Sequence, residues 1–276
     1  MILTIVLTVY NKESFLQRAL DALLNQEGTN EGDYEVLAVN DGSTDGSAAI
    51  LEEYARLDSR VRILTQQNQG LSMARNNGIE VALGDYVWFV DADDVIASNS
   101  VHLICGAIRS KPDVIPIYAK TEGIDRVRNR IDVRAETGKD ILRGWKCEQC
   151  GVFWILRKDF LVDNNLRFFK GIYHEDAEFT PRMLYLAKTV KVIPEVLYFV
   201  YRDPDSITQV PRPKRAFDYL IVSERLSNFV VENGETGTII GKVIDGNTAQ
   251  NINNALAIIT KNSKEERKKF NREFYM

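Results

Sequence analysis

The carboxylates with the clearest potential for chemistry are Asp91, Asp93 and Asp94, which follow the apolar run Tyr86–Val90. An uninterrupted run of β-branched and aromatic residues is typical of a strand that is buried on both faces. Because side chains alternate along a strand, Asp91 and Asp93 are expected on one side, where two hard oxygen donors provide half of a divalent-cation site. The alternative is a plain strand end, with Asp94 as the cap of a following helix.

A second acidic pair, Glu175 and Asp176, begins a segment with the apolar spacing of a helix, residues 175–187. A positioned carboxylate can accept the proton of an attacking hydroxyl, and such general bases contribute roughly 10² to 10⁴ in rate. The alternative is structural, since acidic residues in a first helical turn also complement the helix dipole. The pair by itself favours neither interpretation.

The elements that must position these carboxylates alternate between strand and helix. Apolar runs predict strands over residues 3–9, 34–39, 61–64 and 86–90, and apolar periodicity predicts helices between them, the third over 71–82. This alternation indicates an α/β fold with a parallel, doubly wound sheet. Such a sheet gathers on one edge the polar residues after its strands, which are Tyr10-Asn11, Asn40-Asp41, Gln66 to Asn68 and Asp91 to Asp94.

The turn after the second strand contains Gly42 and Gly46 but lacks the G-x-G-x-x-G pattern of a dinucleotide site. It predicts a helix start, with Ser43 or Thr44 as the N-cap. The expected buried face of that helix consists of Ala49, Ile50, Tyr54 and Leu57.

Beyond residue 95 the pattern predicts a helix over 101–108 and a strand over 113–119, in which Pro116 indicates an edge position. Residues 120–136 are charged and non-periodic, which predicts a mobile loop. Thr137 and Asp140 are spaced as in a capped helix start. Two amphipathic helices are expected over 214–232 and 236–260.

Composition excludes several classes of protein. The chain has 276 residues and a formal net charge of −4, so no global field attracts nucleic acid. No stretch approaches the apolar length that spans a bilayer, and the first residues are interpreted as a strand and not a signal peptide. Three cysteines argue against a disulfide framework and suit a reducing cytoplasm. Cys147 and Cys150 have zinc or redox spacing, but without a second pair they are interpreted as ordinary thiols.

Five blocks in order resemble the family 2 glycosyltransferases of the GT-A fold. They are TIVLTVYNKESFLQRALDALLNQ (4–26), YEVLAVNDGSTDGS (34–47), NQGLSMARNNGIEVALGDYVWFVDADD (68–94), YHEDAEFTPRML (173–184) and LYFVYRDPDSIT (197–208). The resemblance implies an α/β fold with a Rossmann-like, mostly parallel central sheet flanked by helices. It implies a nucleotide-sugar-binding half over 1–95 and an acceptor-binding and catalytic half over 96–212. Residues 213–276 would form a C-terminal helical extension.

The resemblance also implies a donor site. Residues implied to bind the nucleotide-sugar are Thr8, Val9, Tyr10, Glu13, Asp41, Asn68, Gly70, Arg75, Asp91 and Ala92. Asp41 would accept a hydrogen bond from the N3–H group of uracil, which favours a UDP-sugar. Asp93, with Asp91, would bind Mg²⁺ or Mn²⁺ at the diphosphate, where the metal offsets the charge of the leaving nucleotide.

For the transfer step, the resemblance implies that Asp176 is the general base and that Glu175 supports it. His174, Tyr201 and Arg202 would lie toward the acceptor or the diphosphate. The expected activity is metal-dependent, inverting transfer of a sugar to a hydroxyl of a glycan or lipid-linked acceptor in surface polysaccharide synthesis. The expected location is cytoplasmic, at the inner face of a membrane if the C-terminal helices contact lipid. The other interaction expected of these helices is the contact of a homodimer.

Two other classes of function remain as alternatives. A sugar nucleotidyltransferase would share the nucleotide-binding sheet, but the glycine- and lysine-rich N-terminal loop of that class is missing. A non-catalytic subunit that binds sugar nucleotides or glycans would not need the full acidic set of Asp91, Asp93, Glu175 and Asp176.

Overall fold

The computed structural model describes residues 1–144, 148–201 and 213–261. Cys147 and Arg202, both named above, lie outside the described residues.

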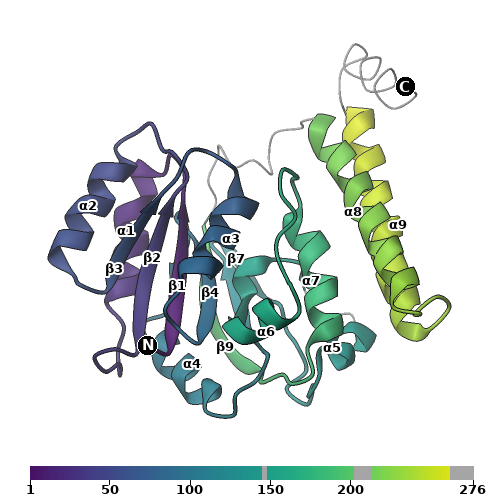
Figure 1. Ribbon diagram of the computed structural model, residues 1–276, viewed down its shortest axis with the longest axis horizontal. Helices are drawn as coiled ribbons and strands as arrows, with labels where there is room; N and C mark the ends of the chain where they lie inside the picture. Colours follow the sequence, from purple (N-terminus) through teal and green to yellow (C-terminus); the bar gives the residue numbers. More distant parts are fainter. Residues whose placement is uncertain (145–147, 202–212, 262–276) are drawn as a thin grey trace.

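The first part of the chain forms four parallel strands with a helix in each crossover (Figure 1). The elements are β1 (Leu3–Val9), α1 (Glu13–Leu24), β2 (Tyr34–Asn40), α2 (Ser47–Leu57), β3 (Val61–Thr65), α3 (Leu71–Val81) and β4 (Tyr86–Asp91). In the order β3-β2-β1-β4, the chain adds β2 and then β3 on one side of β1 and returns to add β4 on the other side. Right-handed crossovers therefore place α1 and α2 on one face of the sheet and α3 on the opposite face. Residues 3–9, 34–40 and 86–90 are buried throughout, which confirms strands covered on both faces.

The start of α2 differs from the prediction. The helix begins at Ser47 with Gly46 at its N-cap, because the preceding polar residues bind the loop after β1 instead. Ser43 accepts a hydrogen bond from the amide of Asn11, and Thr44 donates one back to the Asn11 side chain.

The expected buried face of α2 is also wrong in part. Leu57 is 66% exposed and Ala49 is exposed, whereas Leu51 is fully buried; Ile50 and Tyr54 pack against the core from partly buried positions.

The second part extends the same sheet with strands of both directions. Its elements are β5 (Val95–Ile96), α4 (Ser100–Ile108), β6 (Val114–Thr121), β7 (Ile124–Arg128), α5 (Gly138–Gly144), the 3-10 helix η1 (Gly151–Phe153), β8 (Trp154–Arg157), α6 (Lys158–Asp163), α7 (Glu175–Leu186) and β9 (Ile193–Val200). Strand β8 lies antiparallel between β4 and β6, and the sheet order is β3-β2-β1-β4-β8-β6-β9-β5, with β7 paired to β6. The sheet is therefore mixed: β3, β2, β1 and β4 pair only in parallel with one another, and the second part contributes antiparallel pairs together with one parallel pair, β6 with β9.

Two predictions for this part are wrong. β6 is not an edge strand, because β8 and β9 flank it. Pro116 is tolerated because pairing with β8 ends at Pro116 and the ladder to β9 begins at Ile117, with register shifts just beyond. The charged segment 120–136 is not simply a loop, since β7 folds back on β6. The helix start at Thr137 and Asp140 is confirmed by hydrogen bonds in both directions.

The two predicted C-terminal helices are present as α8 (Pro213–Glu232) and α9 (Ile239–Lys261). They pack on each other as a hairpin, with α8 beside α7 (Figure 1). Buried residues of the hairpin join the main core, namely Val222, Leu226, Val230, Ile240 and Ile244. Within the described ranges, no helix is both long and apolar enough to cross a membrane.

Candidate functional site

The four strand ends meet on one edge of the sheet, as the sequence predicted. The parallel registers place Val9 beside Asn40, and Asn40 beside Thr65. On the other side of β1, Thr8 lies beside Asp91 and donates to its Oδ1 atom at 3.2 Å. Polar groups from separate crossovers are therefore close enough to form one site.

Asp41 organises the loop between β3 and α3. Its carboxylate accepts hydrogen bonds from the Gln66 side chain at 2.7 Å and from the backbone amides of Gln69 and Gly70, both at 2.8 Å. Gly70 has φ +85°, a conformation that favours glycine. A carboxylate offers about four acceptor positions. Since three are used within the protein, a role of Asp41 in base recognition would depend on the remaining one.

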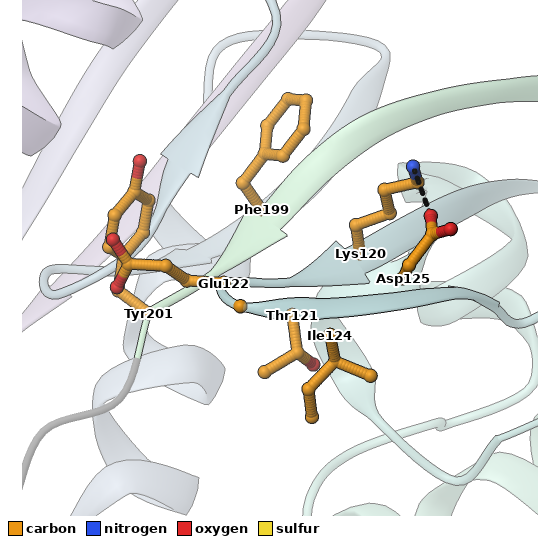
Figure 2. Close-up of a pocket in the computed structure, with 8 residues that line it drawn as sticks. Lys120, Thr121, Glu122, Ile124, Asp125, Phe199 and Tyr201 are labelled. Atoms are coloured by element: carbon orange, nitrogen blue, oxygen red, sulfur yellow. Dashed lines mark hydrogen bonds and ion pairs between the residues drawn. The ribbon is translucent and has the colours of Figure 1, made fainter.

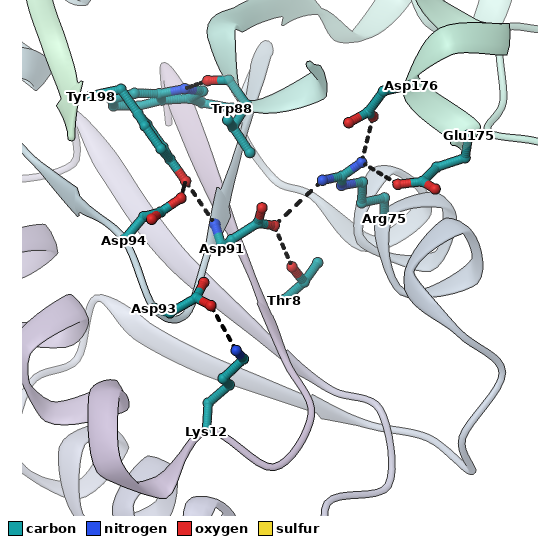
Figure 3. A network of polar contacts seen from close by, with 11 residues as sticks. Thr8, Lys12, Arg75, Trp88, Asp91, Asp93, Asp94, Glu175, Asp176 and Tyr198 are labelled. Atoms are coloured by element: carbon teal, nitrogen blue, oxygen red, sulfur yellow. Dashed lines mark hydrogen bonds and ion pairs between the residues drawn. The ribbon is translucent and has the colours of Figure 1, made fainter. Parts of the chain in front are cut away.

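Arg75 is the centre of the site and is 1% exposed on α3. Its Nη1 atom donates to Asp176 Oδ1 at 2.6 Å and to Glu175 Oε1 at 3.1 Å, and its Nη2 atom donates to Asp91 Oδ1 at 3.3 Å. Figure 3 shows the guanidinium between the end of β4 and the start of α7. One buried cation therefore joins the two groups of carboxylates that the sequence singled out.

Burial and charge set the protonation of this cluster. Burial opposes the charge of Arg75, but Asp176, Asp91 and Glu175 together raise its pKa, so the guanidinium stays charged. Burial raises the pKa of Glu175, and the neighbouring charge of Asp176 adds to this while Arg75 opposes it. The pair thus contains a buried carboxyl that holds a proton more readily than usual beside a more exposed one.

Asp93 and Asp91 are paired with different basic side chains, Asp93 with Lys12 and Asp91 with Arg75. Lys12 Nζ lies 2.6 Å from Asp93 Oδ2, and Arg18 donates to the Asp93 carbonyl oxygen at 2.6 Å. Burial, then the charge of Asp91, raises the pKa of Asp93, and Lys12 opposes the shift. Figure 3 shows Lys12 reaching Asp93 from the loop after β1.

This donor set fits a hard divalent cation in part. Asp91 and Asp93 offer carboxylate oxygens at one strand end, and Mg²⁺ and Mn²⁺ accept such donors together with water and phosphate. Among the described residues, no group of three or more His, Cys, Asp or Glu side chains could hold a metal ion by itself. Remaining ligands would therefore come from substrate and water, and Lys12 would have to leave Asp93.

Asp94 is a tether, not a helix cap. Its carboxyl accepts hydrogen bonds from the Tyr198 hydroxyl at 2.7 Å and the Tyr201 amide at 2.8 Å, while α4 starts later, at Ser100. The Tyr198 oxygen also accepts from the Asp91 amide at 3.1 Å. Burial, followed by the charge of Asp91, raises the pKa of Asp94 to about 8. The end of β4 is thereby fixed to the end of β9.

The other predicted donor-site residues fall into three groups. Val9 and Ala92 are each 1% exposed as whole residues, so neither is accessible to a ligand in this structure. Tyr10, 48% exposed, and Asn68 lie at the surface of the strand-end edge. Glu13 accepts a hydrogen bond from the Gly46 amide at 2.9 Å and so stabilises the start of α2.

The predicted acceptor-side residues are not brought together. Tyr201 packs under Arg18, whose guanidinium carbon is 3.8 Å from the ring centroid, and it borders a surface hollow of about 440 Å³ (Figure 2). The hollow is lined by Lys120, Thr121, Glu122, Gly123, Ile124, Asp125, Phe199 and Tyr201. His174 lies immediately before α7, where its ring stacks on Tyr219 of α8.

Sequence reasoning missed two residues that touch the site. Lys12 could have been found as a cation next to a predicted strand end. Gly151 carries no such signal: a Cβ atom built there would lie 2.7 Å from Asp176 Oδ1 and 3.1 Å from Arg75 Nη1. Cys150, the neighbour of Gly151, is a free thiol.

The chain belongs to glycosyl transferase family 2, whose sequence pattern matches residues 4–163, more than half of the 276 residues. The family identified from the five blocks is therefore confirmed. Among curated proteins, the chain is 31% identical over 222 residues to the uncharacterized glycosyltransferase EpsJ of Bacillus subtilis (strain 168). That match covers 76% of this chain and 64% of the relative, so the chain spans less than two thirds of the relative's length.

Solved structures confirm the GT-A fold. S. aureus TarS 1–349 in complex with UDP-GlcNAc matches with a TM-score of 0.73 at 21% identity, over 97% of this chain and 78% of that chain. The mannosyltransferase PcManGT from Pyrobaculum calidifontis, in complex with GDP-Man and Mn²⁺, matches with a TM-score of 0.63 at 13% identity, over 99% and 79%. At these identities the likeness shows the fold alone.

Proposed function

We propose that the chain transfers a sugar from a nucleotide-sugar to a hydroxyl of a glycan or lipid-linked acceptor, with inversion at the anomeric carbon and with a divalent cation. The observation that carries the proposal is the position of Arg75, which joins Asp91 at the end of β4 to Glu175 and Asp176 at the start of α7. Membership of glycosyl transferase family 2 supports the reaction class.

On the donor side, the strand-end edge from Thr8 to Asp91 receives the nucleotide, with Asp41 and Gly70 ordering the loop beside it. We favour a UDP-sugar because Asp41 presents an acceptor to the N3–H group of uracil; the UDP-GlcNAc bound by TarS agrees with this, and the GDP-Man bound by PcManGT shows that the fold accepts another base. Asp91 and Asp93 would hold Mn²⁺ or Mg²⁺. When bound, the ion supplies electrostatic stabilisation for the departing diphosphate.

On the acceptor side, Asp176 takes the hydroxyl proton while the hydroxyl oxygen attacks the anomeric carbon and the nucleotide diphosphate leaves from the opposite face. Asp176 is favoured over Glu175 because its side chain is more exposed, 18% against 10%, and can therefore more readily meet an acceptor hydroxyl. Burial and the charge of Asp176 raise the pKa of Glu175, so Glu175 holds a proton more readily than an ordinary carboxyl and adds less negative charge beside Asp176.

The hollow beside Tyr201 is the proposed contact for the acceptor chain. Aromatic rings such as Phe199 and Tyr201 pack on the apolar faces of sugars, and Glu122 and Asp125 accept hydrogen bonds from hydroxyl groups. A contact of the C-terminal helices with a membrane surface or with a second copy stays a prediction, as does a cytoplasmic location.

The donor site is tested by thermal stability with UDP, GDP, CDP and dTDP, each with Mn²⁺ or with EDTA. Binding to the folded state raises the unfolding midpoint by mass action. We expect a shift with UDP and Mn²⁺ that disappears with EDTA and in Asp93→Ala. No shift with any nucleotide would contradict the proposed donor site.

The base is tested with Asp176→Asn and Glu175→Gln, assayed by UDP release from UDP-sugars over a panel of glycan acceptors. Asp176→Asn should retain the nucleotide-dependent thermal shift. Its rate of transfer should fall by roughly 10²-fold or more, because general bases typically contribute at least this much to a rate. Glu175→Gln should retain more activity. Full turnover in Asp176→Asn would exclude Asp176 as the base.

A further inference from the structure

The segment that carries the acidic pair, residues 171–178, is bound on one side by helix α8. We propose that α8 is a positioning element for the transfer reaction, and that Asp218 and Tyr219 hold this segment in the conformation that directs Glu175 and Asp176 onto Arg75. The inference rests on the proposed function only for the role of the acidic pair; the contacts themselves are independent of it.

The first contact is a buried carboxylate on the backbone before α7. Asp218 is 2% exposed, and its Oδ2 atom accepts a hydrogen bond from the Tyr173 amide at 2.7 Å. Lys214, one turn earlier on α8, binds both Asp218 oxygens and donates to the Gly171 carbonyl at 2.8 Å. Backbone donors and acceptors of the segment are therefore tied to two charged side chains of one helix.

The second contact holds a strained residue. His174 has φ +64°, in the left-handed region that non-glycine residues adopt only when their surroundings enforce it. Its imidazole stacks on Tyr219, with ring centroids 3.7 Å apart and planes at 11°. Because His174 directly precedes Glu175, its backbone angles set the direction in which α7 and its first carboxylates begin.

The third contact is on the next turn of α7. Arg225 of α8 donates from Nε to Glu178 Oε1 at 2.9 Å, and Arg182 donates to the other Glu178 oxygen at 2.7 Å. Glu178 is fully buried, so this ion pair has a defined geometry and little freedom to slide. Helix α8 thus binds the chain on both sides of the acidic pair, at residues 171–174 before α7 and at Glu178 within it.

Two parts of the protein therefore hold the acidic pair in different ways. Arg75 binds the carboxylates from the sheet side, and α8 fixes the backbone that presents them. Misplacement of a catalytic group by about 1 Å can lower a rate by roughly 10²-fold. Loosening the α8 contacts should therefore reduce transfer without disturbing the nucleotide site, which is built from β1 to β4.

The test uses matched variants of the full chain. Tyr219→Leu removes the stacked ring, Tyr219→Phe retains it, and Asp218→Ala removes the acceptor for the Tyr173 amide. Glu224→Ala, an exposed position of the same helix, is the control. The readouts are kcat and KM for the donor, UDP affinity, and hydrogen exchange of residues 171–178.

We expect kcat to fall about 10- to 100-fold in Tyr219→Leu and Asp218→Ala, with UDP affinity within about twofold and faster exchange of residues 171–178. Tyr219→Phe and Glu224→Ala should match the wild type. An unchanged kcat with faster exchange would overturn the positioning role, and unchanged exchange would overturn the structural contact. If Asp176→Asn keeps full turnover, the proposed base fails, while the exchange result still decides whether α8 holds the segment.

Discussion

Arg75 and Asp176 are 101 positions apart in the sequence and are joined by a contact of 2.6 Å between Nη1 and Oδ1. The same guanidinium binds Asp91, so a single residue of α3 connects the strand-end edge of the sheet to the acidic pair of α7. The geometry of both groups of carboxylates therefore depends on one buried side chain.

Arg75→Met should destabilise the fold by about 3 kcal/mol, because removing one partner of a buried ion pair leaves the other charges uncompensated. Arg75→Lys keeps the charge but lacks the planar fork that reaches Asp91 and the acidic pair together. We expect Arg75→Lys to fold with a smaller loss of stability and to lose transfer. Urea unfolding and the UDP-release assay measure the two effects.

The control for Arg75 is Arg134→Met, which breaks an exposed ion pair with Asp132. Such pairs contribute about 0–1 kcal/mol, so little change is expected. Equal loss of stability in the two methionine variants would contradict the central role of Arg75.

Gly151→Ala should impair transfer more than stability. A Cβ atom there would lie 2.7 Å from Asp176 Oδ1 and 3.1 Å from Arg75 Nη1, so the contact between these two side chains must shift to make room for it. Because side-chain ends and not backbone are displaced, the loss of stability should stay near 1 kcal/mol, while kcat should fall about 10-fold or more. UDP affinity should be unchanged.

Gly106→Ala in α4 is the matched control, since a Cβ atom there meets nothing within 4 Å. Alanine in a helix interior is favoured over glycine by roughly 0.5–1 kcal/mol, so Gly106→Ala should be as stable as the wild type or more so, with full activity. Wild-type kcat in Gly151→Ala would show that the space above Asp176 is not required.

The parts of the fold that the sequence predicted are those with a strong local signal. β1 to β4 and α3 follow from apolar runs and periodicity, and the convergence of Asp41, Gly70, Thr8 and Asp91 follows from the parallel connection of those strands. The error at β6 has a different origin. Pro116 lacks an amide donor whether or not a strand is central, and only the two-sided change of partner at that residue, a tertiary feature, makes the position acceptable.

In the candidate site too, the features that could be predicted are those with a local signal in the sequence. Acidic residues at a strand end and at a helix start could be singled out, and the resemblance pointed to Arg75 on the nucleotide side. Its pairing with both acidic groups at once could not be predicted, because Arg75 gives no periodic or spacing signal of its partners. Gly151 and Tyr219 act through close approach and stacking between segments far apart in sequence, and such contacts leave no local pattern. Asp94 had the signal of a cap and serves instead as a buried tether to Tyr198.

Lys12→Met should increase the affinity for Mn²⁺ in the absence of nucleotide. Lys12 Nζ lies 2.6 Å from Asp93 Oδ2, so a cation bound at Asp93 competes with the ammonium group for this oxygen and is repelled by its charge. Hydrogen bonds to charged groups contribute about 1.5–3 kcal/mol when well formed, and partial exposure to solvent lowers this contribution. We therefore expect Mn²⁺ affinity to rise about tenfold when the lysine is removed. Paramagnetic resonance of free Mn²⁺ measures the binding directly.

Arg18→Met is the control for Lys12, because Arg18 binds the Asp93 carbonyl oxygen and leaves the carboxylate untouched. It should alter Mn²⁺ affinity less than Lys12→Met does. Weaker Mn²⁺ binding in Lys12→Met would mean that the ion does not compete with the lysine, and would count against Asp93 as a ligand.

His174 should make the stability of the protein depend on pH. Burial, and then the charge of Arg215, lowers the pKa of His174 from 6.5 to about 4 in the folded state. Between these values the unfolded chain binds a proton that the folded chain does not, so His174 contributes stability above pH 6.5 that is lost as the pH falls toward 4. For a side chain that is only partly buried, we expect a loss of about 1–2 kcal/mol.

His174→Asn isolates this effect, because asparagine also tolerates the left-handed backbone conformation and does not titrate in this range. The unfolding free energies of wild type and variant are measured in urea at pH 7.5 and pH 4.5. From the higher to the lower pH, the wild type should lose more unfolding free energy than His174→Asn does. All other titrating groups are common to both proteins and cancel in the difference. If the difference is the same at both pH values, the imidazole titrates alike in the folded and unfolded states, and its stacking on Tyr219 then exists without desolvation of the ring.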